Sequence, residues 1–331
     1  MYLGIDVGSV STNLALINKD GKVMETIYLL TEGDPVNAVR KGLQVLKLRL
    51  PSNAEIKGVG ATGSARNIIG VFVNAVIVKN EIIAHAIGSL NSIPDLQTVI
   101  EIGGQDSKII IVREGIPVDF SMNTICAAGT GSFLDHQASR LGIPIEKFGE
   151  YAQNSNKGVK IAGRCTVFAE SDMIHKQQLG HSKEDIINGL CEAIVRNFLN
   201  NVARGKDLLT PIVFQGGVAS NIGVVRAFER DLKTELIVPE HHNVMGAIGI
   251  ALLTKEQMEK EGIYAKFDFE LAKIKINVCS FECKDCPNRC EVVEILREGT
   301  IIDRTGDRCG KWAVSENNHN NVLEVSGNRR N

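Results

Sequence analysis

The sequence has few aromatic residues, no excess of basic charge and no long apolar run. Phe, Tyr and Trp make up 5% of the 331 residues. Lys and Arg number 37 against 39 Asp and Glu, which gives no support for a nucleic-acid-binding face or a polybasic membrane-binding segment. No apolar run reaches the roughly 20 residues of a membrane-spanning helix. The N-terminus, MYLGIDVGS, is typical of a strand and not of a signal peptide, so we expect a cytoplasmic protein.

Glycine, by contrast, is abundant. The 32 glycines cluster where apolar segments end, as in α/β folds that bind phosphate. Hydrophobic residues make up 44% and charged residues 23%, which is typical of a globular protein. The length allows two or more domains.

A weak internal repeat relates residues 3–21 to residues 99–115. In each copy an apolar strand reaches an acid, Asp6 or Glu101, and a glycine follows two positions later. A second strand comes next, so each copy predicts a β-hairpin. The duplication predicts two similar lobes across a cleft. Apolar spacing predicts helices over 34–50, 183–204, 219–231 and 244–259, and a strand over 212–218.

The first candidate phosphate turn follows Asp6. Gly8, Ser9, Ser11 and Thr12 offer backbone N–H groups and hydroxyls to phosphate oxygens. Asp6 could hold Mg²⁺ through water, because Mg²⁺ prefers one or two carboxylates together with phosphates. The alternative is a simple hairpin turn.

The second candidate phosphate turn follows Glu101. Gly103 and Gly104 would let the backbone approach a phosphate closely. Gln105 could orient a water molecule, and Glu101 or Asp106 could polarise it. A solvated turn is the alternative, but the pairing with the first copy favours a nucleotide site.

A third glycine-rich turn, with Gly216, Gly217 and Ala219, ends the strand predicted over 212–218. Because glycine has no side chain, a flat ring can lie directly against the backbone at such a junction, which suits adenine and ribose. A packing turn is the alternative. Three such turns in this order predict an ATP-binding core.

Two cysteines stand outside these turns. Cys126 in NTICAAGTGSF and Cys165 in AGRCTVF precede predicted helices over 131–141 and 167–178. Helix N-termini favour thiolates and negatively charged clusters. ATP hydrolysis needs no thiol, whereas two thiols from each subunit of a homodimer would match the ligand count of one [4Fe–4S] cluster. The alternative, a buried hydrophobic role, is the one that we prefer for Cys191.

A second group of cysteines follows a change of composition near residue 262. Cys283, Cys286, Cys290 and Cys309 could form a Cys₄ zinc site or hold another iron–sulfur cluster. Cys279 competes as a ligand. We expect any such metal to be held locally, within residues 279–309.

The motifs together resemble a known family. DVGS, EIGGQD and FQGGVASN resemble the two phosphate loops and the adenosine loop of the actin, sugar-kinase and chaperone ATPase superfamily, and residues 244–249 resemble its second interlobe helix. NTICAAGTGSFLD and GRCTVFAESDMI resemble activators of 2-hydroxyacyl-CoA dehydratases, which are relatives of benzoyl-CoA reductase ATPase subunits and of double-cubane cluster protein reductases. The resemblance covers residues 1–253. It implies a homodimer in which Cys126 and Cys165 of both subunits hold one [4Fe–4S] cluster.

We therefore predict an α/β protein with two RNase-H-like lobes, residues 1–96 and 97–260, in which the helix over 244–260 is able to return to the first lobe. A metal-binding segment over 261–312 and a mobile tail over 313–331 would follow. The resemblance implies an ATP-hydrolysing electron donor. It would pass single low-potential electrons from ferredoxin or flavodoxin to an iron–sulfur partner, a 2-hydroxyacyl-CoA dehydratase or a double-cubane cluster protein.

Two other functions share the ATP core. A sugar or small-metabolite kinase would need a base for a substrate hydroxyl, and the sequence shows no separate sugar-binding candidate. A regulatory ATPase would have inert Cys126 and Cys165 and a zinc-binding docking segment. Anaerobic purification distinguishes them: a brown dimer with about four irons indicates the electron donor, and a colourless monomer that phosphorylates a sugar indicates the kinase.

Overall fold

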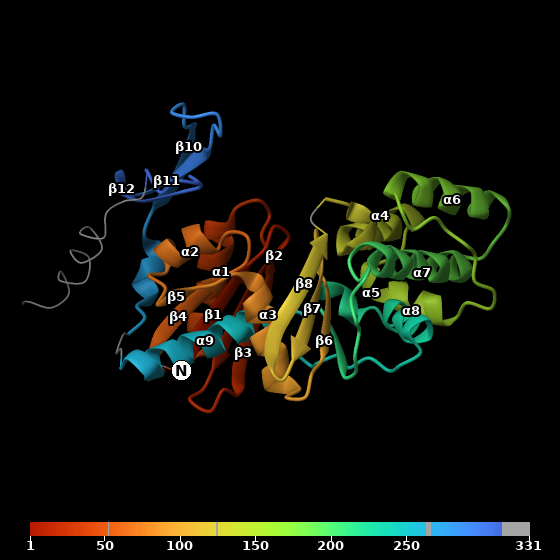
Figure 1. Ribbon diagram of the computed structural model, residues 1–331, viewed down its shortest axis with the longest axis horizontal. Helices are drawn as coiled ribbons and strands as arrows, with labels where there is room; N and C mark the ends of the chain where they lie inside the picture. Colours follow the sequence, from red (N-terminus) through yellow and green to blue (C-terminus); the bar gives the residue numbers. More distant parts are fainter. Residues whose placement is uncertain (52, 124, 263–265, 313–331) are drawn as a thin grey trace, which may run out of the picture.

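The computed structural model describes residues 1–51, 53–123, 125–262 and 266–312. Two mixed sheets lie side by side, helices pack on both, and a three-stranded sheet projects from the first (Figure 1). None of the described helices has the length and apolar character needed to cross a membrane.

The first sheet has the strand order β3-β2-β1-β4-β5. Strands β1, β2 and β3 pair antiparallel, and β4 and β5 add in parallel next to β1. The hairpin predicted around Asp6 is β1–β2. The strands are β1 (Tyr2–Val7), β2 (Ser11–Ile17), β3 (Val23–Leu30), β4 (Gly58–Thr62) and β5 (Ile77–Val78).

The second sheet repeats this order as β8-β7-β6-β9. A parallel bridge from Val213 to Ile237 lies where β5 lies in the first sheet. The hairpin predicted around Glu101 is β6–β7, so the internal repeat is confirmed as a structural one. The strands are β6 (Thr98–Ile102), β7 (Ser107–Arg113), β8 (Ile116–Asn123) and β9 (Ile212–Gln215).

The four helices predicted from apolar spacing correspond to α1, α7, α8 and α9. Side chains of Asp34, Ser182 and Asn221 accept hydrogen bonds at the N-termini of α1, α7 and α8, which satisfies backbone donors there. The helices are α1 (Pro35–Arg49), α2 (Arg66–Phe72), α3 (Glu81–Ser92), α4 (Gly131–Leu141), α5 (Ile145–Gln153), α6 (Thr166–Gln178), α7 (Lys183–Asn201), α8 (Ile222–Leu232) and α9 (Met245–Glu261), with short 3₁₀ turns η1 (Ala127–Gly129), η2 (Gly217–Ser220) and η3 (Phe269–Lys273).

Helix α9 follows the second sheet in sequence but packs on the first. A Cβ atom on Gly4 would lie 1.9 Å from the Ala247 carbonyl oxygen, and one on Gly60 would lie 2.1 Å from Thr254 Oγ1. Only glycine permits so close an approach of helix and sheet. On its other side, α9 touches α3 at Gly249, where a Cβ would lie 1.7 Å from the Ala84 carbonyl oxygen. This packing connects the two halves of the protein.

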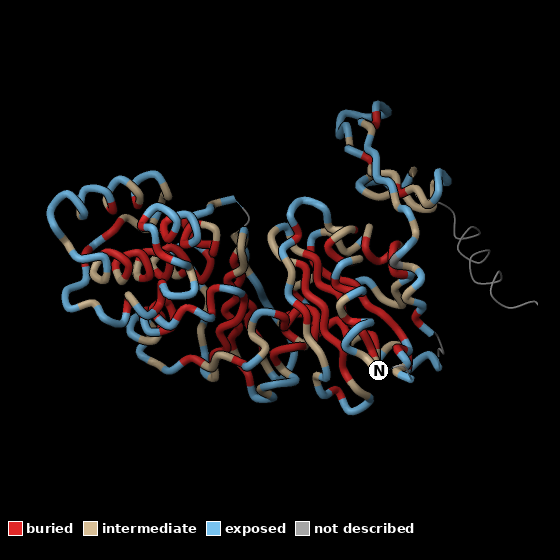
Figure 2. Tube along the Cα trace, turned by 180° about the vertical axis from the view of Figure 1, so that it is seen from behind, coloured by how far each residue is buried: buried red, intermediate tan, exposed pale blue. Residues whose placement is uncertain are grey.

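The C-terminal module, residues 276–312, contains β10 (Ile276–Glu282), β11 (Glu291–Arg297) and β12 (Thr300–Thr305), paired antiparallel in that order. Phe267, just before it, is buried in the core of the first lobe and donates its N–H to the Ile56 carbonyl at 2.9 Å. Figure 2 shows extensive burial in both lobes and little in the module. The predicted mobile tail over 313–331 lies outside the described residues.

Candidate functional site

The two candidate phosphate turns face each other. The Gly8 N–H donates to the Ser11 carbonyl at 2.9 Å, and the Gly103 N–H donates to the Asp106 carbonyl at 3.0 Å. Val10 of the first turn packs on Gly104 of the second, where a Cβ would lie 2.7 Å from Val10 Cβ. The same type of turn, one from each sheet, therefore meets where the two sheets come together.

The hydroxyl groups of the first turn differ in how far they are buried. Thr12 is fully buried, and its hydroxyl bonds Thr31 Oγ1 at 3.0 Å, which in turn donates to the Gly8 carbonyl at 2.9 Å. Thr12 thus braces the turn. Ser9 is exposed and Ser11 is half-buried, so these two are better placed to meet a ligand.

Asp6 lies at the centre of the site on β1. Burial raises the pKa of its carboxyl group to about 7, the Glu81 and Asp106 charges raise it further, and the Lys108 charge opposes them. Asn13 is opposite Asp6 across the hairpin, and its buried Oδ1 has no hydrogen-bond partner among the described residues. A buried carboxylate beside an unsatisfied amide oxygen fits a hydrated Mg²⁺ ion.

Glu101 belongs to a buried charge network that the sequence analysis missed. The Lys108 ammonium contacts Glu101 Oε2 at 2.9 Å, Asp106 Oδ1 at 2.7 Å and Glu81 Oε1 at 3.2 Å. Burial raises the pKa of Glu101 to about 7, opposed by Lys108. Burial alone would lower the pKa of Lys108, but the three carboxylates raise it well above its usual range. Lys108 faces Glu101 in the β6–β7 register, so the predicted hairpin contained the signal.

Gln105 and the third glycine-rich turn remain accessible to a ligand. Gln105 is exposed. Gly216 has φ +89°, and a Cβ there would lie 2.3 Å from the Ile102 carbonyl oxygen, so the position requires glycine. Gly217 has no other atom within 4 Å of an ideal Cβ position, which leaves open space beside bare backbone. Ala219 is buried below it. These features fit a flat ligand such as adenine.

Another buried network lies behind this turn. Gln215, at the end of β9, contacts His85 Nδ1 at 2.9 Å through its Nε2 and accepts from Ser89 Oγ at 2.6 Å. Burial, with a smaller effect of the Lys108 charge, lowers the pKa of His85 to about 3, so the ring is neutral. These contacts join α3, which packs on α9, to the strand that carries the third turn.

The structure brings Cys126 into contact with the segment that carries Cys165, although the two are far apart in sequence. Cys126 Sγ lies 3.8 Å from the carbonyl oxygen of Arg164, the residue before Cys165. Cys126 is the N-cap of η1 and Cys165 the N-cap of α6, and neither thiol makes a capping hydrogen bond. Asn123 holds the first loop by accepting from the Cys126 N–H at 2.9 Å. Asn197 on α7 holds the second by donating to the Gly163 carbonyl at 2.5 Å.

The second phosphate turn is bonded directly to the segment that carries Cys126. The Gly131 N–H donates to the Gly103 carbonyl at 2.8 Å, and the Ser132 N–H donates to the Gly104 carbonyl at 2.9 Å. Ser132 Oγ also donates to the Gly104 carbonyl, at 2.6 Å. Gly131 and Ser132 begin α4, a few residues after Cys126. These bonds connect the turn to the helix that follows Cys126.

The surroundings of the two thiols are basic on one side and apolar on another. A pocket of about 930 Å³ beside Cys165 is lined by Lys160, Arg164, Arg196 and Arg204 and by no carboxylate. Ile125 is 96% exposed, and Val167 and Phe168 are each 66% exposed. Large apolar side chains next to both cysteines suggest that another protein surface covers them.

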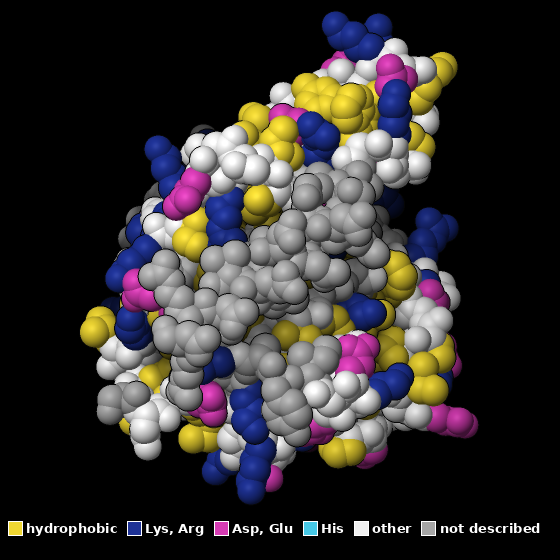
Figure 3. All heavy atoms as spheres, turned by 90° about the vertical axis from the view of Figure 1, so that its left-hand side faces the viewer, with side chains coloured by type: hydrophobic (Ala, Val, Ile, Leu, Met, Phe, Trp, Pro, Cys, Tyr) yellow, Lys and Arg dark blue, Asp and Glu magenta, His cyan; other side chains and the backbone are white. Residues whose placement is uncertain are grey.

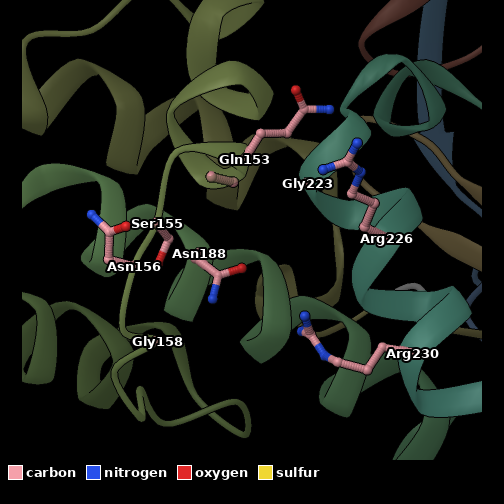
Figure 4. A pocket seen from close by; sticks show the side chains of 9 residues that line it. Gln153, Ser155, Asn156, Gly158, Asn188, Gly223, Arg226 and Arg230 are labelled. Atoms are coloured by element: carbon pink, nitrogen blue, oxygen red, sulfur yellow. The ribbon is translucent and has the colours of Figure 1, made fainter.

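A smaller polar pocket of about 220 Å³ opens beside α8 (Figure 4). Arg226 and Arg230 extend from α8, and Ser155, Asn156 and Asn188 lie across from them. None of the predicted nucleotide residues lines this pocket, so it is separate from the turns described above.

The remaining cysteines differ in position. Cys191 is fully buried, as predicted, and burial raises the pKa of its thiol to about 12. Cys283, Cys286, Cys290 and Cys309 lie in the C-terminal module, and all eight cysteines are free thiols. No three His, Cys, Asp or Glu side chains form a metal-binding group within the described ranges.

Residues 3–254 match the BadF/BadG/BcrA/BcrD ATPase family, and the chain belongs to this ATPase family. The (R)-2-hydroxyglutaryl-CoA dehydratase activating ATPase of Acidaminococcus fermentans is 35% identical over 78% of this chain and 98% of its own length. The activator of lactoyl-CoA dehydratase of Anaerotignum propionicum is 37% identical over 79% of this chain and all of its own length.

A solved structure agrees with these sequence relationships. The activator of the 2-hydroxyisocaproyl-CoA dehydratase from Clostridium difficile, with bound ADPNP, superposes with a TM-score of 0.70 at 31% identity. The match covers 79% of this chain and 97% of that one. The predicted family is confirmed. So is the predicted fold, that of actin and sugar kinases, which a ROK family glucokinase from Streptomyces griseus shares with a TM-score of 0.50 at 12% identity. The C-terminal module lies beyond the residues that match the family.

Proposed function

We propose that this ATPase transfers single low-potential electrons to an iron–sulfur dehydratase. The observation that carries the proposal is the junction between Gly103–Gly104 and Gly131–Ser132, because it connects a phosphate turn to a pair of free thiols. A metabolite kinase has no use for such a connection. The names of the two curated relatives, activators of acyl-CoA dehydratases, support the same partner class.

The nucleotide roles follow from position. Asp6 would hold Mg²⁺ through water, while Ser9 and Ser11 bind phosphate oxygens. Gly8, whose N–H donates to the Ser11 carbonyl, and Thr12 would shape their turn. In the second turn, Gly103 and Gly104 would let the terminal phosphate approach the backbone closely, and Gln105 would orient the attacking water. Glu101 and Asp106, both held by Lys108, would polarise that water. Gly216, Gly217 and Ala219 would form the adenosine site.

Cys126 and Cys165 would supply half of the ligands of a [4Fe–4S] cluster, and a second copy of the chain would supply the rest. The Cys126 thiol lies beside the residue that precedes Cys165, and both thiols are uncapped and partly exposed, so they fit this role. When bound, the cluster would accept and release one electron at a time. Burial of Ile125, Val167 and Phe168 against the second copy would stabilise a homodimer.

ATP would act through the position of α4. Hydrolysis to ADP and phosphate removes the terminal phosphoryl group from the second turn. Gly103 and Gly104 can then move, and their three hydrogen bonds to α4 would move Cys126 with them. Helix α4 would then have two positions, one with ATP bound and one after hydrolysis, and a small shift of the turn would switch it between them. Ligand position and solvent access both change cluster potential.

The basic pocket beside Cys165 supports an acidic electron donor such as ferredoxin or flavodoxin. Lys160, Arg164 and Arg204 make no ion pair with other described residues, so they are available to steer an acidic partner. A dehydratase or a double-cubane cluster protein would receive the electron.

We also propose that the two lobes comprise residues 1–96 and 97–260.

Anaerobic metal analysis tests the proposal. The wild-type protein should purify as a dimer with about four irons. Cys126→Ser and Cys165→Ser should each lose that iron and keep MgATP affinity, because neither residue lies in a nucleotide turn. Cys279→Ser is the matched control, since Cys279 is exposed and lies in the C-terminal module. The proposal fails if the Cys126→Ser and Cys165→Ser variants keep their full iron and colour.

A further inference from the structure

The C-terminal module is too small to be stable through its core alone. Among residues 276–312 only Cys283, Val292 and Ile295 are buried. Units below roughly 40 residues usually need a disulfide, a metal or oligomerisation for stability. All five cysteines of the module are free thiols. Figure 3 shows the module standing out from the body of the protein with hydrophobic side chains on its surface.

The β10–β11 hairpin brings three cysteines to one end of the small sheet. Cys283 directly follows β10 and Cys290 directly precedes β11. The Cys283 N–H donates to the Cys290 carbonyl at 2.8 Å, which extends the ladder by one pair. Directly paired residues in antiparallel strands project to the same face. Cys286 lies in the loop between them, where the Arg289 N–H donates to its carbonyl at 3.2 Å.

A fourth cysteine arrives at the same end after β12. Because β12 is antiparallel to β11, it ends where β11 begins. Gly306, with φ +101°, then crosses the start of β11 so closely that a Cβ would lie 2.4 Å from the Glu291 carbonyl oxygen. Lys311 forms an ion pair with Asp285 of the hairpin loop. The turn that contains Cys309 is thereby fixed beside the loop that contains Cys286.

The chain after Cys309 also packs back on the hairpin. The Trp312 ring meets the Phe281 ring edge to face, with centroids 4.9 Å apart. The Arg304 guanidinium lies 5.5 Å from the centre of the Trp312 ring. The Trp312 N–H donates to Asp307 Oδ2 at 3.2 Å. These contacts close residues 307–312 over the end of the sheet.

We propose that Cys283, Cys286, Cys290 and Cys309 bind one Zn²⁺ ion in a tetrahedral thiolate site that holds the module together. Binding releases the four thiol protons, so that one Zn²⁺ and four thiols give a site of charge −2 and four H⁺. Lys284, Arg289 and Arg308 are adjacent in sequence to ligands and offset that charge.

Ion binding requires the four thiols to converge, because no three His, Cys, Asp or Glu side chains of the described residues are placed to hold a metal ion. The Cys283 thiol now lies 3.7 Å from Asp285 Oδ2, and the Cys309 thiol lies 4.0 Å from Asp307 Oδ2. These contacts are replaced when the sulfurs rotate to Zn–S distances of about 2.3 Å. Cys279 is excluded from the ligand set. It lies within β10 opposite Glu294, and its thiol contacts Glu294 Oε2 at 3.6 Å.

The test uses the full-length chain with Cys126→Ser and Cys165→Ser, so that the proposed cluster does not contribute. Zinc per chain is measured after equilibration with Zn²⁺ and removal of excess ion. We expect one zinc in this background and in its Cys279→Ser derivative. Adding Cys283→Ser or Cys309→Ser should weaken zinc binding at least tenfold.

Two further readouts separate ligation from unfolding. Trp312 is the single tryptophan of the sequence, so its fluorescence should change on chelation with EDTA and recover on Zn²⁺ addition. Co²⁺ added to the zinc-free protein should give the absorption of a tetrahedral thiolate site in the background and in Cys279→Ser, and not in Cys290→Ser. Absence of zinc, loss of zinc in Cys279→Ser, a cysteine disulfide or an iron–sulfur cluster in the module would each overturn the assignment.

Discussion

Replacing Lys108 with Met should destabilise the protein strongly and in a pH-dependent way. The side chain is 4% exposed and faces Glu101, Asp106 and Glu81 within 3.2 Å. Removing one partner of a buried ion pair typically costs 3–5 kcal/mol, because the remaining charge is left uncompensated. We expect a loss of about 4 kcal/mol at pH 8.

The sign of the pH dependence follows from Glu101. Its pKa in the folded protein, already raised by burial, rises further when the Lys108 charge is removed. An acid with a raised folded-state pKa binds its proton more tightly in the folded than in the unfolded protein. The variant's stability therefore falls as pH rises from the unfolded pKa of about 4.5 toward the folded one, by up to about 1.4 kcal/mol per pH unit. The deficit should thus be smaller at pH 6 than at pH 8.

Urea unfolding followed by far-ultraviolet circular dichroism at pH 6, 7 and 8 would measure this effect. Tryptophan fluorescence is unsuitable, because Trp312 reports on the C-terminal module. Lys206→Met is the matched control: its ammonium pairs with the exposed Asp119 at 2.7 Å, so its loss should change stability little, because solvent screens such a pair. A Lys108→Met variant as stable as Lys206→Met, or a deficit that grows toward pH 6, would refute the reasoning.

Three other variants test the nucleotide turns. The MgATP affinity of the wild type should increase with pH, by up to about tenfold per unit, until Asp6 is ionised near pH 7. In Asp6→Asn the MgATP affinity should be weak and should not change with pH. In Gln105→Ala, steady-state turnover should fall roughly 100-fold while MgATP affinity stays within about twofold, since water orientation matters in the transition state; unchanged turnover rejects the role. Ser132→Ala removes one bond to Gly104, worth about 1 kcal/mol, and should reduce the effect of ATP on the alkylation rate of Cys126 in cluster-free protein; an undiminished effect places the coupling elsewhere.

Local features were predictable from the sequence because neighbouring residues determine them. The hairpins around Asp6 and Glu101 follow from strand residues separated by a short glycine-bearing turn. Helices α1, α7, α8 and α9 follow from apolar spacing and from capping residues such as Asn221. The family was also recognisable, since the glycine-rich turns and cysteine motifs that carry the resemblance are continuous in sequence.

Tertiary structure decided what depends on distant contacts. It placed Cys126 beside Arg164, and it joined Gly131 to Gly103, because α4 begins against the second phosphate turn. It turned the Thr12 hydroxyl to Thr31. No sequence spacing reports where separate loops meet after folding.

The burial of Lys108 and the position of α9 were also not determined by the sequence alone, because they depend on charge pairing and close packing in the folded protein. A lysine in a strand is usually solvated, yet Lys108 is buried because three carboxylates, from α3 and from the β6–β7 hairpin, surround it. Helix α9 returns to the first sheet because Gly4 and Gly60 leave no side chain in its path. The sequence by itself determined the hairpins, the glycine turns and the family, whereas the fold decided which groups share a buried site, since burial and contact depend on the whole chain.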